Sequence, residues 1–134
     1  MCLYVNSEKK PELREAVGDI TVWKVLVRNS RGISTPYQRY PVTDKTMVAD
    51  GCCRPENDGL AVKLRWRISE GVIHSYAHGY DAELVARRLK LLFGFCSIVV
   101  EATIPAGTPC ILGEEDACIP SYGSTQLVLK NIEI

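Results

Sequence analysis

Short runs of β-branched and aromatic residues dominate the chain and predict a protein built mainly from strands. The run ITVWKVLVR (20–28) stops at an Asn-Ser-Arg-Gly turn, which is typical of a strand end. In LAVKLRWRI (60–68), apolar side chains alternate with Lys63, Arg65 and Arg67, the pattern of a strand with one face in water. The other predicted strands are 2–5, 72–76, 96–104 and 126–134, with a short hairpin around 110–118.

A single convincing helix is predicted in the second half of the chain. It begins at Asp81, a suitable N-cap, and ends before Gly94, a suitable C′ glycine. Val85, Leu89 and Leu92 share one face, which predicts packing against a sheet. The expected fold class is therefore α+β: a mostly antiparallel sheet of about five to seven strands with one main helix packed on it.

Length and charge limit the classes of protein to consider. A chain of 134 residues predicts a single domain, residues 1–134, that buries roughly two-thirds of the surface of its unfolded form. Sixteen basic residues balance sixteen acidic ones, so no overall field attracts nucleic acid or anionic lipid. We therefore expect neither a nucleic-acid partner nor a membrane partner.

The N-terminal residues and the cysteines predict the compartment. The first residues become charged within eight positions and show no apolar run typical of a secretion signal, so we expect a cytoplasmic protein. Six cysteines in that compartment are expected to be free thiols, and their spacing is not that of a zinc site, so no metal is expected. The predicted hairpin brings Cys110 and Cys118 close. A disulfide between them is favoured more by an oxidising buffer than by a cell, and whether any cysteines pair stays open.

The best candidate for catalytic chemistry is the segment GVIHSY (71–76), which precedes the helix. Alternation places His74 and Tyr76 on one face, and a histidine between a strand end and a helix is suited to acid–base catalysis or ligand binding. Glu101, in the apolar run IVVEATI, is the carboxylate expected to be buried beside His74. His74 and Glu101 are therefore the candidate catalytic residues. The alternative, which we favour, is a structural histidine.

A second candidate lies in STPYQRYPV (34–42), where two prolines keep the chain extended. Tyr37, Arg39 and Tyr40 are suited to an anion or a flat ring, because arginine forms paired hydrogen bonds with carboxylate or phosphate and tyrosine stacks. A surface loop anchored by its rings is the simpler interpretation. Tyr37, Arg39 and Tyr76 are the candidate ligand-binding residues.

The order of motifs along the chain resembles a family of small uncharacterised bacterial and bacteriophage proteins. The resemblance covers most of the chain, through MCLYV, ITVWKVL, TPYQRY, GVIHSY, VVEATIPAGTPC and STQLVL. Members carry aromatic residues soon after the I-P-x-G turn, where this chain has Pro109-Cys110. The resemblance implies a phage- or mobile-element-associated accessory protein without an assigned activity.

A more distant similarity is to ADP-ribosyltransferase-like domains. GVIHS (71–75), followed by an alanine-bearing helix, is similar to the middle motif of that family, and QLVL (126–129) is similar to its last motif. The family's catalytic glutamate falls on Gln126, which cannot carry the negative charge that supports an oxocarbenium-like centre. The similarity therefore implies at most a degenerate domain of this kind.

Two functions from different classes follow. The favoured one is a non-enzymatic accessory or binding protein without a cofactor, able to form a homo-oligomer through an exposed edge strand at 126–134. The alternative is a small enzyme or ligand-binding protein that uses His74 with Tyr37, Arg39, Tyr76 and Glu101. Convergence of these side chains in one concave pocket would favour the alternative, and their dispersal would favour the first.

Overall fold

Two long antiparallel strands form the centre of the fold in the computed structural model, which describes residues 3–57, 65–115 and 118–134. Strand β3 (Ile20–Asn29) pairs with β9 (Ser97–Ile104) in a register that runs from Ile20–Ile104 to Val27–Ser97. Both strands are buried on their two faces over much of their length, which explains why their sequences are nearly continuous apolar runs.

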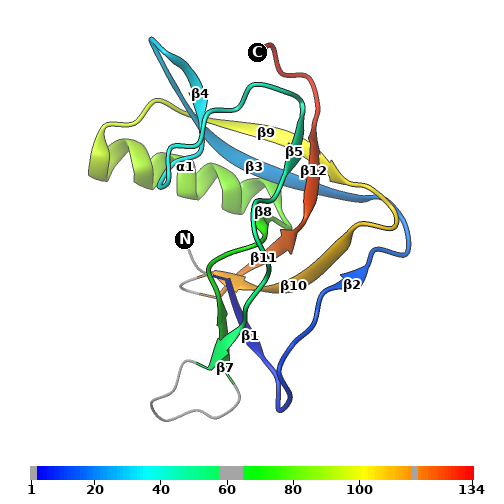
Figure 1. Ribbon diagram of the computed structural model, residues 1–134. Coiled ribbons are helices and arrows are strands. Elements are labelled where there is room, and N and C mark those ends of the chain that lie inside the picture. Colours follow the sequence, from blue (N-terminus) through cyan, green and yellow to red (C-terminus); the bar gives the residue numbers. More distant parts are fainter. Residues whose placement is uncertain (1–2, 58–64, 116–117) are drawn as a thin grey trace.

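The other strands extend the sheet on both sides of this pair (Figure 1). They are β1 (Leu3–Asn6), β2 (Arg14–Glu15), β4 (Gly32–Ser34), β5 (Thr46–Val48), β6 (Glu56–Asn57), β7 (Arg65–Ile68), β8 (Ile73–Tyr76), β10 (Pro109–Glu115), β11 (Ile119–Ser124) and β12 (Gln126–Leu129). Their hydrogen-bonded order is β5-β12-β9-β3-β8-β11-β10-β1-β7-β6, with β2 beside β10 and β4 beside β3. Every one of these pairings is antiparallel.

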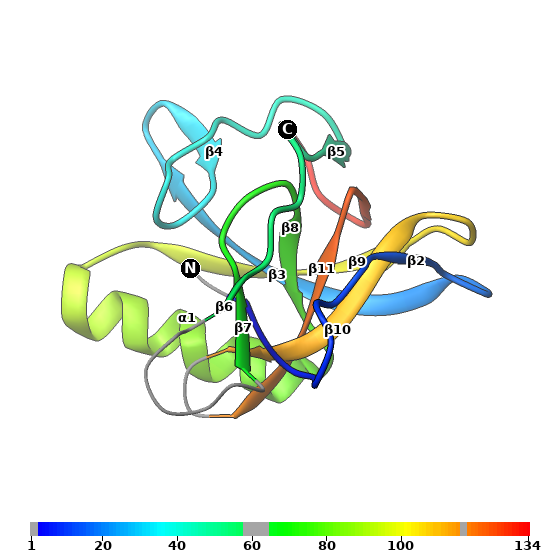
Figure 2. The same ribbon diagram turned by 60° about the horizontal axis from the view of Figure 1, so that its bottom comes forward.

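The two faces of β3 and β9 are covered by different parts of the chain. Helix α1 (Gly79–Phe93) lies along one face, and the segment that carries β4 and β5 lies over the other (Figure 2). Val25 packs with the helix, whereas Val22 and Leu26 pack with Ile33 and Val42 of the covering segment. The alternation of β3 thus divides the core into a helix-side cluster and a second cluster under the 33–50 segment.

Helix α1 begins earlier than its sequence pattern indicates. Its N-cap is His78, in extended conformation, and Asp81 lies buried in the first turn rather than at the cap. Gly94 has a φ of 71° and its N–H donates to the carbonyl oxygen of Lys90, as expected for a C′ glycine. The buried face consists of small and aliphatic side chains (Ala82, Val85, Ala86 and Leu89), whereas Leu92, expected on this face, is 72% exposed.

The predicted fold class is wrong in its proportions. The described residues form twelve strands in a single sheet and one helix, so the protein is dominated by its sheet and is not an α+β fold of five to seven strands. The strands expected at 20–28, 72–76 and 96–104 are present as β3, β8 and β9. The additional strands include β2, β4, β5 and β6, which have only two or three residues each and are too short for a periodic pattern.

Strand β12 is not the exposed edge expected for residues 126–134. It ends at Leu129 and pairs with β9 on one side and β5 on the other. Its hydrogen-bonding groups therefore already have partners within the chain, and a homo-oligomer through this strand is not supported.

The predicted strand at 60–68 is described only from residue 65 onward, and residues 60–64 lie outside the described part of the chain. Cys110 and Cys118 are far apart along the β10–β11 hairpin, because Cys110 faces Ser124 and Cys118 lies at the turn. The described cysteines are free thiols. Within the described ranges, the structure has no helix of the length and apolarity required to cross a membrane.

Candidate functional site

A cavity of about 560 Å³ lies between the 35–50 segment and the residues that lead into β8. The loop that forms one wall is held closed by hydrogen bonds, because the N–H of Thr35 donates to the carbonyl oxygen of Tyr40 at 3.0 Å and the N–H of Tyr40 donates to Thr35 Oγ1 at 3.0 Å. Just beyond the loop, the N–H of Val42 donates to the carbonyl oxygen of Ile33 at 2.8 Å. We call this space the Lys24–His74 cavity, after two polar residues that line it.

The opposite wall depends on Gly71, which is buried and has a φ of 76°. A Cβ atom at this position would collide with the backbone of Cys52 and Cys53, which packs directly against the glycine. Residue 71 must therefore combine a left-handed backbone with the absence of a side chain. This contact positions the entry into β8, and with it His74.

Lys24 comes to the cavity from the centre of β3 and is only 7% exposed. Lys24 lies two residues from both Val22 and Leu26, so its side chain points to the same face of the strand as theirs. The aliphatic part of the lysine side chain therefore lies in the same apolar surroundings. Burial lowers the pKa of Lys24 to about 8, and the negative charge of Glu115 offsets only part of this effect. The protein thus holds an amine whose positive charge is incompletely compensated.

His74 comes to the same cavity from β8, which meets β3 at the pair Trp23–Tyr76. Its Nε2 atom is buried and has no hydrogen-bond partner among the described residues. Burial, followed by the positive charges of Lys24 and of the N-terminal amine, lowers the pKa of His74 to about 3. The imidazole is therefore neutral at physiological pH.

Buried Tyr76 and partly buried Glu115 form a pair that is electrostatically coupled to the cavity. The hydroxyl of Tyr76, which is 2% exposed, donates a hydrogen bond to the carboxylate of Glu115. Burial, followed by the charge and the hydrogen bond of Glu115 and by the charge of Tyr37, raises the pKa of Tyr76. Glu115 also attracts the ammonium of Lys24. Five polar side chains are thereby coupled: Lys24, Tyr37, His74, Tyr76 and Glu115.

The structure brings together some of the residues predicted from the sequence and separates others. His74 and Tyr37 line one cavity, and Tyr76 is coupled to both Tyr37 and Glu115. Arg39 is not among the residues that line the cavity: its backbone is left-handed, with a φ of 55°, and its guanidinium lies 4.9 Å from the ring centre of Phe95, just beyond the helix end.

Glu101 also lies outside the cavity, contrary to the expectation that it is buried beside His74. Val100 and Ala102 are buried in the core, so the residue between them points the other way and its side chain is 45% exposed. The carboxylate lies 3.8 Å from Nζ of Lys130, a surface ion pair. The carboxylate that interacts with Lys24 and Tyr76 beside the cavity is that of Glu115, not that of Glu101.

Two members of the cluster, Lys24 and Glu115, were missed by the sequence-based interpretation. The sequence does indicate that Lys24 is unusual, because it is the single cation within the apolar run ITVWKVLV, where the strand is buried on both faces. Glu115 carried no such signal, because it belongs to the run Glu-Glu-Asp that predicts an exposed hairpin tip. Its partial burial follows from the pairing of Glu115 with Ile119 in the β10–β11 hairpin.

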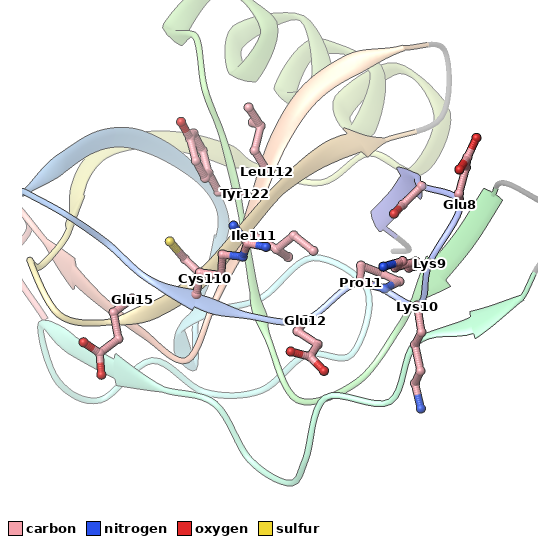
Figure 3. Close-up of a pocket in the computed structure, with 12 residues that line it drawn as sticks. Glu8, Lys9, Lys10, Pro11, Glu12, Glu15, Cys110, Ile111, Leu112 and Tyr122 are labelled. Atoms are coloured by element: carbon pink, nitrogen blue, oxygen red, sulfur yellow. The ribbon is translucent and has the colours of Figure 1, made fainter.

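A second, larger hollow of about 820 Å³ lies between the 7–15 segment and strand β10 (Figure 3). Its charged side chains are exposed, and those of Lys10, Glu12 and Glu15 point away from Cys110 and Ile111 in this view. Burial raises the pKa of the Cys110 thiol, which makes it a poorer nucleophile. No buried polar atom without a partner lines this hollow among the described residues, so the Lys24–His74 cavity is the better candidate.

Comparison of the chain with protein-family models, with curated proteins and with solved structures finds no match. In the described part of the chain, no group of three or more histidine, cysteine, aspartate or glutamate side chains is arranged to hold a metal ion.

Proposed function

We propose that the protein is a small-molecule-binding protein whose ligand enters the Lys24–His74 cavity and places a polar group against these two side chains. The observation that carries the proposal is the convergence of a buried lysine and a buried, unpartnered imidazole nitrogen on one cavity. Its volume is in the range of ordinary ligand pockets. Buried polar groups normally have hydrogen-bond partners, so a ligand that supplies them gains affinity.

The polar group of the ligand is a hydrogen-bond acceptor. Lys24 has only donors, and burial destabilises its charge more than Glu115 stabilises it. A carbonyl or carboxylate oxygen beside Nζ compensates that charge, because it replaces the water that burial removed. His74, which lines the same cavity, provides a second contact to this end of the ligand.

The walls of the cavity limit the rest of the ligand. Tyr37 and Tyr40 line the cavity with substantially exposed rings, which suit an apolar or flat body. Asp44, Asp50 and Glu70 also line it and repel a molecule with several negative charges. The ligand class is therefore a small molecule with at most one anionic group, which disfavours nucleic acid at this site.

Benzoate, benzamide and inorganic triphosphate are suitable probes, and binding is measured by isothermal titration calorimetry. We expect benzoate and benzamide to bind the wild-type protein and triphosphate not to bind. Lys24→Met and His74→Phe are expected to weaken benzoate binding at least tenfold, whereas Glu12→Gln, in the hollow of Figure 3, leaves it unchanged. Equal affinity of wild type and Lys24→Met for benzoate, or no binding of either aromatic probe, would overturn the proposal.

The proposal includes the cytoplasmic location and the phage or mobile-element association expected from the sequence, each supported only by the sequence features described above. The proposed function is ligand binding and includes no catalysed reaction. The ADP-ribosyltransferase-like alternative gains no support, because Gln126 lies on β12 and is not among the residues that line the cavity.

A further inference from the structure

We propose that Lys24 captures an aldehyde or ketone ligand as a Schiff base within the Lys24–His74 cavity. This inference rests on the proposed function and deepens it, because it names carbonyl compounds as the ligand class. Lys24 is the one lysine or arginine side chain among the described residues that line the cavity, and it reaches the cavity from a rigid central strand. The capture site is therefore a fixed, buried amine rather than a mobile surface lysine.

The amine must be neutral to attack a carbonyl carbon, and the structure favours this form. A lysine with a pKa of 10.5 is neutral in roughly one molecule in 3,000 at pH 7. Burial lowers the pKa of Lys24 to about 8, which raises the neutral fraction to roughly one in ten. Burial therefore supplies several-hundred-fold more of the nucleophilic form than a surface lysine has.

Schiff-base formation at Lys24 needs no reactant other than the carbonyl compound. Nζ attacks the carbonyl carbon, the C=O π electrons move to oxygen, and a proton transfers from nitrogen to that oxygen, giving a carbinolamine. The remaining N–H proton and the hydroxyl then leave as water, and the C=N bond forms. The sum is amine plus carbonyl giving imine plus water, without an oxidant or reductant. His74, with a pKa of about 3, stays neutral and places no second positive charge beside the amine, and the negative charge of Glu115 stabilises the cationic iminium.

Apart from these two, the charged groups around the cavity are the carboxylates at its wall (Asp44, Asp50 and Glu70) and the N-terminal amine, whose positive charge acts on His74; the hydroxyl of Tyr37 is neutral. The carboxylates and the hydroxyl do not compete for a carbonyl group at neutral pH, whereas the N-terminal amine, with an ordinary pKa of roughly 8, does, so its adduct has to be mapped separately. Modification by a carbonyl compound is therefore expected at one residue of the cavity.

The test uses benzaldehyde with sodium cyanoborohydride, which reduces an imine to a stable secondary amine. Peptide mapping of the full-length wild-type protein is expected to show a rapid adduct on Lys24 that excess benzoate suppresses, separate from any adduct on the N-terminal amine, which benzoate leaves unchanged. The rate is expected to rise with pH to a midpoint near 8. Lys24→Arg keeps the charge and loses the adduct, whereas Lys45→Arg, on the exposed surface, retains it.

The outcomes separate this inference from the proposed function. If benzoate binds but benzaldehyde gives no adduct, or labels the surface lysines as fast as Lys24, the inference is overturned and the binding proposal stands. If neither compound engages the cavity, both are overturned. A wild-type rate midpoint near 10.5 instead of 8 also overturns the inference, and this readout does not depend on whether a variant folds.

Discussion

Replacing Lys24 by methionine tests the electrostatic basis of the cavity most directly. Burial lowers the pKa of Lys24 from 10.5 to about 8, so the folded protein destabilises the charged amine relative to the unfolded chain. This difference corresponds to about 3 kcal/mol, because one pH unit is worth about 1.4 kcal/mol. Methionine has a similar length and no charge. We expect Lys24→Met to be more stable than wild type at pH 7 by about 1–3 kcal/mol.

The lowered pKa of Lys24 also predicts the direction in which the free energy of unfolding changes with pH. Between pH 8 and 10.5 the unfolded chain binds the Lys24 proton more readily than the folded protein does, so wild-type stability rises with pH in this window. We expect a rise of about 2 kcal/mol from this group between pH 7 and 9.5. The rise should be absent in Lys24→Met and present in Lys45→Met, whose lysine is exposed.

The assay is urea denaturation followed by tryptophan fluorescence, at pH 7 and at pH 9.5, for wild type and both variants. If Lys24→Met is less stable than wild type at pH 7, the charge of Lys24 is well compensated and the reasoning fails. A pH slope that is the same in wild type and Lys24→Met would refute it equally. A folded spectrum for each variant, measured by circular dichroism, is the control for gross structural change.

Three further variants test other parts of the structure by urea denaturation. The pKa of His74 is about 3 in the folded protein and 6.5 in the unfolded chain, so the protein loses stability as pH falls from about 6.5 toward 3. His74→Gln should reduce that loss, and an unchanged dependence of stability on pH in this range would contradict the argument. Gly71→Ala should lose at least about 2 kcal/mol through its positive φ and backbone collision, whereas Gly18→Ala, in open space, should lose less than about 0.5, so similar losses would refute the argument. Tyr76→Phe should lose about 1–3 kcal/mol by depriving Glu115 of a hydrogen bond, and wild-type stability would show that this bond contributes nothing.

Local sequence pattern was sufficient where a segment is long and strongly apolar. Strands β3 and β9 lie where their β-branched runs predict, because each is covered on both faces over much of its length and therefore carries mostly apolar side chains. Gly94 ends helix α1 as predicted, because its left-handed backbone is a local requirement. The start of the helix was misplaced by three residues from Asp81, since the real cap, His78, contributes no side-chain hydrogen bond that a sequence motif reveals.

The number of strands was underestimated because the shortest strands exist only through their partners. Strand β5 has three residues and is defined by its pairing with β12, and β2 has two residues and is defined by β10. Strand β12 looked like an edge for the same reason: nothing in residues 126–129 indicates that the distant residues 46–48 cover it. Pairing between segments so far apart in the chain is a property of the whole fold.

The sequence by itself determined the central strands, the helix and the position of His74 just before that helix. Only the tertiary structure decided that Tyr37 and Lys24 join His74 in one cavity, whereas Arg39 and Glu101 lie outside it. The physical reason is that alternation along a strand shows which residues share a face but not what covers that face. The 35–50 segment covers the Lys24 side of β3, and this cover turns an ordinary lysine into a buried amine of lowered pKa.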